Sequence, residues 1–124
     1  AVSMMKDVLR IDRDRGVRLQ TTFDLTRFAR ALAFAGGAGA EAVRLLSSAE
    51  AVRNEMMGAG VPAYLAKVHE EARALLRAQL DDATFAEAWD EGRALTIDEA
   101  LALALDHSSE RAAAPHRGPI PTSR

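Results

Sequence analysis

Residues 81–105 read DDATFAEAWDEGRALTIDEALALAL, and this stretch decides the fold. The two aspartates at its start place carboxylates where a helix N-terminus favours them. Phe85 and Trp89 follow four residues apart, on one face of the predicted helix. Gly92 predicts the end of that helix, because glycine adopts the backbone conformation that closes a helix C-terminus. The first half of the stretch is therefore a short capped helix.

The second half of the stretch predicts another helix. Thr96 and Glu99 have the T-x-x-E spacing of a capping box, in which each side chain bonds the backbone N–H of the other residue. The run at residues 97–105 is apolar on nearly every side, which is more apolar surface than one neighbouring helix covers. We therefore expect a partner surface at Ile97, Leu101, Leu103 and Leu105, covered by a second copy of the chain or by other segments of a parent protein.

The composition favours one helical domain of 124 residues. The net charge of −2 provides no basic field for a nucleic-acid backbone, so no direct nucleic-acid contact is expected. The absence of cysteine excludes disulfides and thiolate metal sites and fits a cytoplasmic protein. No apolar run reaches the roughly 20 residues that a membrane span needs, so no membrane contact is expected.

Helical spacing of apolar residues continues upstream. It predicts four helices. The first covers residues 2–14, the second ends at about residue 35, and the others cover residues 40–57 and 63–80. Thr21, Thr22 and Asp24 are interpreted as N-terminal caps of the second of these helices. The glycine-rich residues 36–39 have no following Lys-Ser/Thr, which indicates a turn between helices rather than a phosphate loop.

The first residues already read as the middle of a helical pattern, so we expect a segment of a longer protein. Residues 1–106 form the predicted helical domain. Residues 107–124 are polar and proline-rich, which predicts a flexible tail or linker.

The polar residues of the predicted helices show no catalytic or metal-binding pattern. His69 is surrounded by charged residues in the sequence and is expected to be solvated, and Ser48 and Arg53 are expected to point outward. His107 and His116 fall in or near the tail. No H-E-x-x-H pattern supplies partners for a metal-ligand role of His69. We expect no metal, no cofactor and no enzymatic activity.

Helix spacing also suggests a repeat. Ala42-x3-Leu46-x2-Ala49 has the spacing of the second helix of a tetratricopeptide unit, where small alanines allow close helix packing. The sequence therefore predicts an all-α fold of antiparallel helical hairpins, a degenerate tetratricopeptide-like α-solenoid of about six helices.

The segment at residues 40–53 and the motif F-x-x-A-W-x-E-G-R-x-L at residues 85–95 carry a family resemblance. Over residues 15–106 the chain resembles the C-terminal part of the tetratricopeptide-like region of bacterial LuxR/AfsR-type ATP-dependent transcriptional regulators. The signature consists of Phe85, Trp89, Gly92, Arg93, Leu95, Thr96 and Glu99. The resemblance implies a non-catalytic interaction or sensor module that binds a protein partner or a ligand.

Other functions stay open at this stage. The same resemblance also allows a regulatory repeat domain of a multidomain nucleotide cyclase or signalling ATPase. A small enzyme using Glu87, Asp90 and Glu91 as acid–base groups is less favoured, because no His, Lys or metal ligand accompanies them. Direct DNA binding would need a basic face that the sequence does not show. Gly92 is interpreted as a cap and Trp89 as a packing residue.

Overall fold

Six helices account for most of the residues that the computed structural model describes, which are residues 2–58 and 61–106. Five of them are α1 (Val2–Arg15), α2 (Arg18–Ala35), α3 (Gly39–Met57), α4 (Ala63–Gln79) and α5 (Asp82–Arg93). The sixth covers residues 97–106, and no strand occurs in the described part. The predicted all-helical class is therefore confirmed. The predicted tail at residues 107–124, with His107 and His116, lies outside the described residues.

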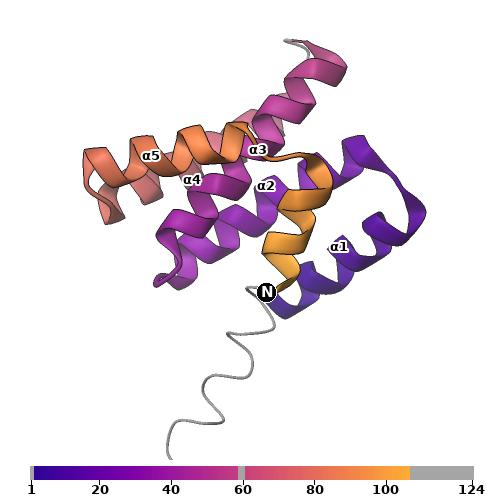
Figure 1. Ribbon diagram of the computed structural model, residues 1–124, viewed down its shortest axis with the longest axis horizontal. Coiled ribbons are helices and arrows are strands. Elements are labelled where there is room, and N and C mark those ends of the chain that lie inside the picture. The colour runs from indigo at the N-terminus through magenta and orange to yellow at the C-terminus, as the bar shows by residue number, and fades with distance from the viewer. Residues whose placement is uncertain (1, 59–60, 107–124) are drawn as a thin grey trace, which may run out of the picture.

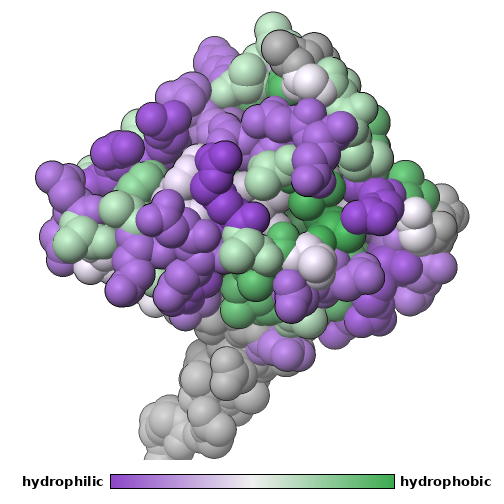
Figure 2. Space-filling view, turned by 45° about the horizontal axis from the view of Figure 1, so that its top comes forward, coloured by the Kyte–Doolittle hydropathy of each residue, from purple (hydrophilic) through white to green (hydrophobic). Residues whose placement is uncertain are grey.

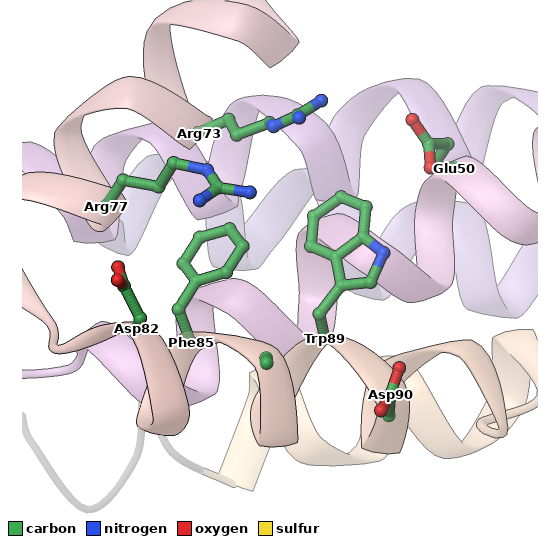
Figure 3. Close-up of a pocket in the computed structure, with 8 residues that line it drawn as sticks. Glu50, Arg73, Arg77, Asp82, Phe85, Trp89 and Asp90 are labelled. Carbon is green, nitrogen blue, oxygen red and sulfur yellow. The ribbon is translucent and has the colours of Figure 1, made fainter.

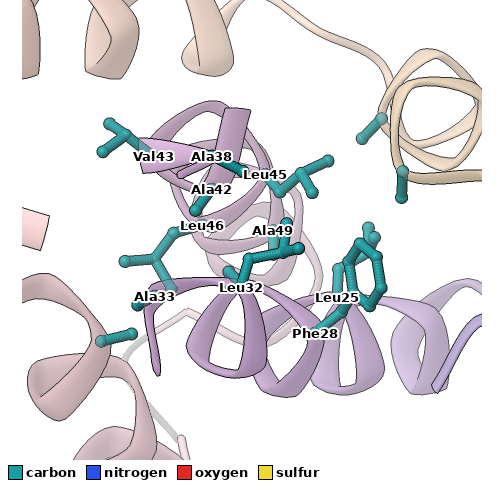
Figure 4. Close-up of a cluster of buried hydrophobic side chains, with 14 of the residues drawn as sticks. Leu25, Phe28, Leu32, Ala33, Ala38, Ala42, Val43, Leu45, Leu46 and Ala49 are labelled. Carbon is teal, nitrogen blue, oxygen red and sulfur yellow. The ribbon is translucent and has the colours of Figure 1, made fainter. Parts of the chain in front are cut away.

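The centre of the fold is the pair formed by α2 and α3. Figure 4 shows Phe28 and Leu32 of α2 near Leu46 and Ala49 of α3, and all four side chains are buried. The small alanine lets the two helices approach closely, while the larger side chains fill the space between them. The close helix packing predicted from the spacing of Leu46 and Ala49 is therefore present.

The other helices pack around this pair (Figure 1). α1 and α4 lie mainly against α2, whereas α5 lies against α3. The helix at residues 97–106 lies beside α1 and α2, where Ile97 and Leu101 are close to Thr21. α4 and α5 therefore rest mainly on different members of the central pair, and their backbones come close to each other at few positions. The tetratricopeptide-like stacking of the hairpins stays a prediction.

The start of α2 corrects the sequence prediction. Thr21, Thr22 and Asp24 do not cap the helix, because α2 begins earlier, at Arg18, and all three side chains are buried within it. The Thr21 hydroxyl donates to the Val17 carbonyl at 2.7 Å. Since a threonine hydroxyl can bond a carbonyl of the preceding turn, threonines are tolerated inside a helix as well as at its start.

Hydrophilic side chains cover much of the surface. On the face shown in Figure 2, the hydrophobic residues are gathered mainly in the centre and are bordered by hydrophilic ones. The large hydrophobic residues that are exposed in the described part are Met4, Ile11, Val17, Phe34, Met56 and Tyr64. These residues come from α1 to α4 and the α1–α2 turn, and none belongs to the helix at residues 97–106.

Candidate functional site

The signature motif lies on α5 and on the turn that follows it. Asp81 caps this helix as predicted, because its carboxylate accepts a hydrogen bond from the Thr84 backbone N–H at 2.7 Å. That bond lowers the pKa of the Asp81 carboxyl. Phe85 is buried and Trp89 is half-buried, and their rings stack with centroids 5.7 Å apart and planes 13° from parallel. One turn of helix thus presents two aromatic rings side by side.

Gly92 has a different role from the one predicted. α5 continues through it to Arg93 and has Ala94 as its C-cap, so Gly92 does not end the helix. Gly92 is buried, and a Cβ atom on it would lie 2.8 Å from both Arg44 Cα and Ser47 Cβ of α3. Glycine is needed here because it allows the two helix backbones to approach closely.

Polar side chains of α3 fasten α5 at this close approach. The Ser47 hydroxyl donates to the Trp89 carbonyl at 2.7 Å. Arg44 Nε donates to a Glu91 carboxylate oxygen, also at 2.7 Å. These contacts fix the position of Trp89 relative to α3.

A cleft of about 540 Å³ lies between α4 and α5 (Figure 3). Its lining comes from three helices and consists of Glu50 of α3, Arg73 and Arg77 of α4, and Asp82, Phe85, Ala86, Trp89 and Asp90 of α5. The α4 side carries the positive charges, and the α5 side carries the aromatic rings with a carboxylate at each end. The volume lies in the range of sites for small molecules.

The two arginines of the cleft lie over its two aromatic rings. The Arg77 guanidinium carbon is 4.5 Å from the Phe85 ring centroid, and that of Arg73 is 5.9 Å from the Trp89 ring. A cation over the face of an aromatic ring is attracted by the ring quadrupole. Each guanidinium is therefore held in place by an aromatic face, as Figure 3 shows for Arg77 above Phe85.

His69, which the sequence predicted to be solvated, is buried next to Trp89. His69 is only 5% exposed, and its ring meets the Trp89 ring edge-on with centroids 6.1 Å apart. Its Nε2 atom is 3.2 Å from a Glu50 oxygen, and neither ring nitrogen forms a hydrogen bond within the described residues. Burial lowers the pKa of the His69 imidazole, although the nearby Glu50 carboxylate acts in the opposite direction. The prediction of a solvated histidine is therefore wrong, because the His69 side chain lies in the core.

Arg53 and Ser48 are also buried rather than exposed. Arg53 donates to the Thr26 hydroxyl at 3.2 Å, and burial lowers the pKa of its guanidinium against the effect of Glu50. The Ser48 hydroxyl donates to the Leu95 carbonyl at 3.5 Å. The sequence pattern fails here because α3 is covered on more than one side, by α2, α4 and α5.

The helix at residues 97–106 confirms one prediction and corrects another. The capping box is present, with Thr96 N–H donating to Glu99 at 2.8 Å and Glu99 N–H donating to the Thr96 hydroxyl at 3.1 Å. Ile97, Leu101 and Leu105, however, are at most 7% exposed in the chain's own core, and Leu103 is half-buried. Because α1 and α2 as well as α3 surround this helix, its apolar faces are covered within the described part and do not form the expected free surface.

The remaining signature and acid–base candidates are dispersed. Arg93 is exposed, with no hydrogen bond to the helix-end carbonyls within residues 2–58 and 61–106. Glu87 is exposed and Glu91 pairs with Arg44, so among these acids Asp90 alone lines the cleft. In the described part no three His, Asp or Glu side chains are grouped so that they could hold a metal ion.

Sequence reasoning did not identify the two cleft arginines. Arg73 and Arg77 are four residues apart on α4, as Phe85 and Trp89 are on α5, and equal spacing is the signal that could have paired them. Arg73 also contacts Glu70, three residues before it on α4, at 3.5 Å. The spacing alone does not reveal that the two helix faces lie opposite each other.

Among the helices of the described part, none combines the length and the apolar character needed to cross a bilayer.

The chain was compared with known proteins in three ways. A scan against family models, a search of curated proteins and a search of solved structures found no match to the chain.

Proposed function

We propose that this chain is a non-catalytic sensor module that binds a ligand in the cleft between α4 and α5. The observation that carries the proposal is the lining of that cleft, where two arginines lie over a stacked pair of aromatic rings. Ligand sites typically combine an apolar surface with a few placed polar groups. The α4–α5 cleft has both.

The packing of the two cleft helices supports a sensing role. α4 rests mainly on α2, and α5 rests on α3, while α4 meets α5 through a few side chains such as Arg77 over Phe85. A molecule bound between them adds contacts that the free protein lacks. Because a ligand favours the arrangement to which it binds best, occupancy of the cleft would restrict the relative position of the two helices. This restriction is the signal that a neighbouring domain could receive.

The motif at residues 85–95 supports the proposed context, a bacterial LuxR-type transcriptional regulator. Two of its residues, Phe85 and Trp89, line the cleft, and Gly92 places α5 against α3. The proposed regulator can be tested by reading the parent protein's sequence on either side of these 124 residues. A helix-turn-helix following Arg124 would support the regulator, whereas a nucleotide cyclase domain would favour the cyclase alternative.

Ligand binding is tested by a thermal-shift screen with a mixed panel of carboxylates, phosphates, amines and neutral aromatic compounds. The variant Ala86→Phe places a ring in the cleft at an exposed position, and Ala83→Phe adds the same ring at an exposed position outside it. We expect at least one chemical class to raise the Tm of the unaltered protein and of Ala83→Phe, but not of Ala86→Phe.

Two results would count against the proposal. One is a panel in which no compound raises the Tm of the unaltered protein. The other is a shift of equal size in Ala86→Phe, which would place the bound compound outside the α4–α5 cleft.

A further inference from the structure

We propose that the ligand of the α4–α5 cleft is a small apolar molecule with a single carboxylate, bound through Arg73 and Arg77 and covering the accessible surface of Trp89 and Ala86. This inference rests on the proposed function, because it names the chemical class that the same cleft takes. It is based on three features of the cleft: the free hydrogen-bond donors of the two guanidinium groups, the position of the lining carboxylates and the apolar surface on α5.

Arg77 has free hydrogen-bond donors. It lies 4.5 Å above the Phe85 ring, and within residues 2–58 and 61–106 it forms no ion pair. A guanidinium over a ring uses its face for that contact, while its N–H donors point outward in the plane. The ring also restricts the arginine side chain before binding, which lowers the entropy lost when an anion is bound.

Arg73 can also bind a ligand anion. Its one ion pair is with Glu70 at 3.5 Å, and the Glu70 side chain is 67% exposed. Exposed pairs of this kind contribute little, so a ligand anion can replace the contact at low cost. Arg73 and Arg77 are one helical turn apart, and they can bind the two oxygens of one carboxylate or approach it from two sides.

The lining carboxylates favour a single negative charge on the ligand. Glu50 is close to the buried Arg53, so its charge is partly balanced within the protein. Asp82 and Asp90 are exposed at the two ends of the α5 side and form no ion pair in the described part. A phosphate or polyphosphate would bring more negative charge toward these carboxylates than a carboxylate does.

The apolar part of the ligand follows from the floor of the cleft. The Phe85 and Trp89 rings lie nearly parallel and adjacent, and Ala86 adds apolar surface at the same face of α5. Figure 3 shows the two rings between the arginines above and the α5 backbone below. Because Phe85 is only 5% exposed, a ring or short alkyl chain attached to the carboxylate would mainly remove the surfaces of Trp89 and Ala86 from water.

The test uses the fluorescence of Trp89, which is the only tryptophan in the chain and lies in the cleft. The full chain is titrated with 3-phenylpropionate, and in parallel with 3-phenylpropylamine, 3-phenylpropanol, acetate and inorganic phosphate. We expect a saturable change in emission with 3-phenylpropionate at lower concentration than with any other probe. This series separates the contribution of the carboxylate from that of the ring.

Three variants locate the binding. Arg77→Gln and Arg73→Gln are each expected to weaken 3-phenylpropionate binding about tenfold, since each removes a charge-assisted hydrogen bond. Arg93→Gln changes an exposed arginine of the same protein outside the cleft and should leave binding unchanged. All three positions are partly or fully exposed, and circular dichroism confirms that each variant is folded.

The outcomes separate this inference from the proposed function. Tighter binding of 3-phenylpropylamine or of inorganic phosphate would overturn the carboxylate assignment and leave the cleft as a ligand site. The same holds if none of these five probes changes Trp89 emission while another class in the thermal-shift panel binds. If neither experiment detects a ligand, both the inference and the proposed function fail.

Discussion

Gly92 of α5 lies directly against the backbone of Arg44 in α3. This contact sets the distance between the two helices, and with it the position of Trp89, whose carbonyl accepts a hydrogen bond from Ser47 at 2.7 Å. The floor of the α4–α5 cleft therefore depends on a residue that does not line it.

Gly92→Ala is expected to destabilise the protein by about 1–3 kcal/mol, because backbone atoms of α3 cannot move aside as a side chain does. Helix propensity alone predicts the opposite, a gain of about 0.5–1 kcal/mol for alanine inside a helix. Urea unfolding measures whether the free energy of unfolding of Gly92→Ala is lower or higher than that of the unaltered protein. Gly39→Ala is the matched control, since a Cβ atom there meets the flexible end of the Leu80 side chain at 2.9 Å. A stabilised Gly92→Ala protein would contradict the close approach.

The burial of His69 makes stability depend on pH. Its pKa is lowered in the folded protein, so above about pH 6.5 the imidazole is neutral in both the folded and the unfolded chain. As the pH falls below that value, the unfolded chain binds a proton that the folded protein does not bind. The free energy of unfolding therefore decreases until the pH reaches the lowered pKa.

This pH dependence is measured as the difference between the unaltered protein and His69→Gln. His107 and His116 are common to both proteins, so their titration largely cancels in the difference. The stability advantage of the unaltered protein should shrink between pH 7 and pH 5. An advantage that grows with acidification would indicate that protonated His69 is stabilised by Glu50 more than burial disfavours it.

The capping box supports the start of the helix at residues 97–106. Thr96→Ala removes the hydroxyl that accepts from the Glu99 N–H, and it should cost about 1 kcal/mol. Amide hydrogen exchange in residues 97–106 should become faster than in α2 and α3. Thr96→Ser keeps the hydroxyl and should behave nearly as the unaltered protein does. Equal exchange in Thr96→Ala and Thr96→Ser would show that the box contributes nothing.

The buried pair of Arg53 and Thr26 is tested by a double-mutant cycle. Thr26→Val removes the hydroxyl that accepts from the Arg53 guanidinium at 3.2 Å and leaves a buried charged donor with one partner fewer. The expected cost is about 1–3 kcal/mol. In an Arg53→Met background the same change should cost much less, because no charge then needs the partner. Additive costs would indicate that the two side chains do not interact.

Local signals in the sequence predicted the helices well. Residue spacing gave the positions of the helices to within a few residues, and the Asp81 cap and the Thr96–Glu99 box are present as predicted. These features depend on residues at most four apart, so the sequence contains all the information they need.

The errors concern side chains whose environment comes from distant segments. Gly92 resembled a helix end because its packing against Arg44 involves residues 48 positions away. His69 resembled a solvated residue because its charged sequence neighbours point elsewhere, while Glu50 and Trp89 cover it. The cleft was missed for the same reason, since its arginines and its rings belong to different helices.

The attachments of α5 to α3 have a mechanical consequence. The polar contacts and the glycine contact all lie between Trp89 and Leu95, at the C-terminal end of the helix and its turn. The N-terminal end of α5 is joined to α4 through Leu80 and Asp81 alone, and Phe85 near that end is buried in the core. Any widening of the cleft would therefore be smallest at Arg77 and Phe85, beside this connection. The Arg73–Trp89 distance would be the most sensitive measure of how far the cleft has opened.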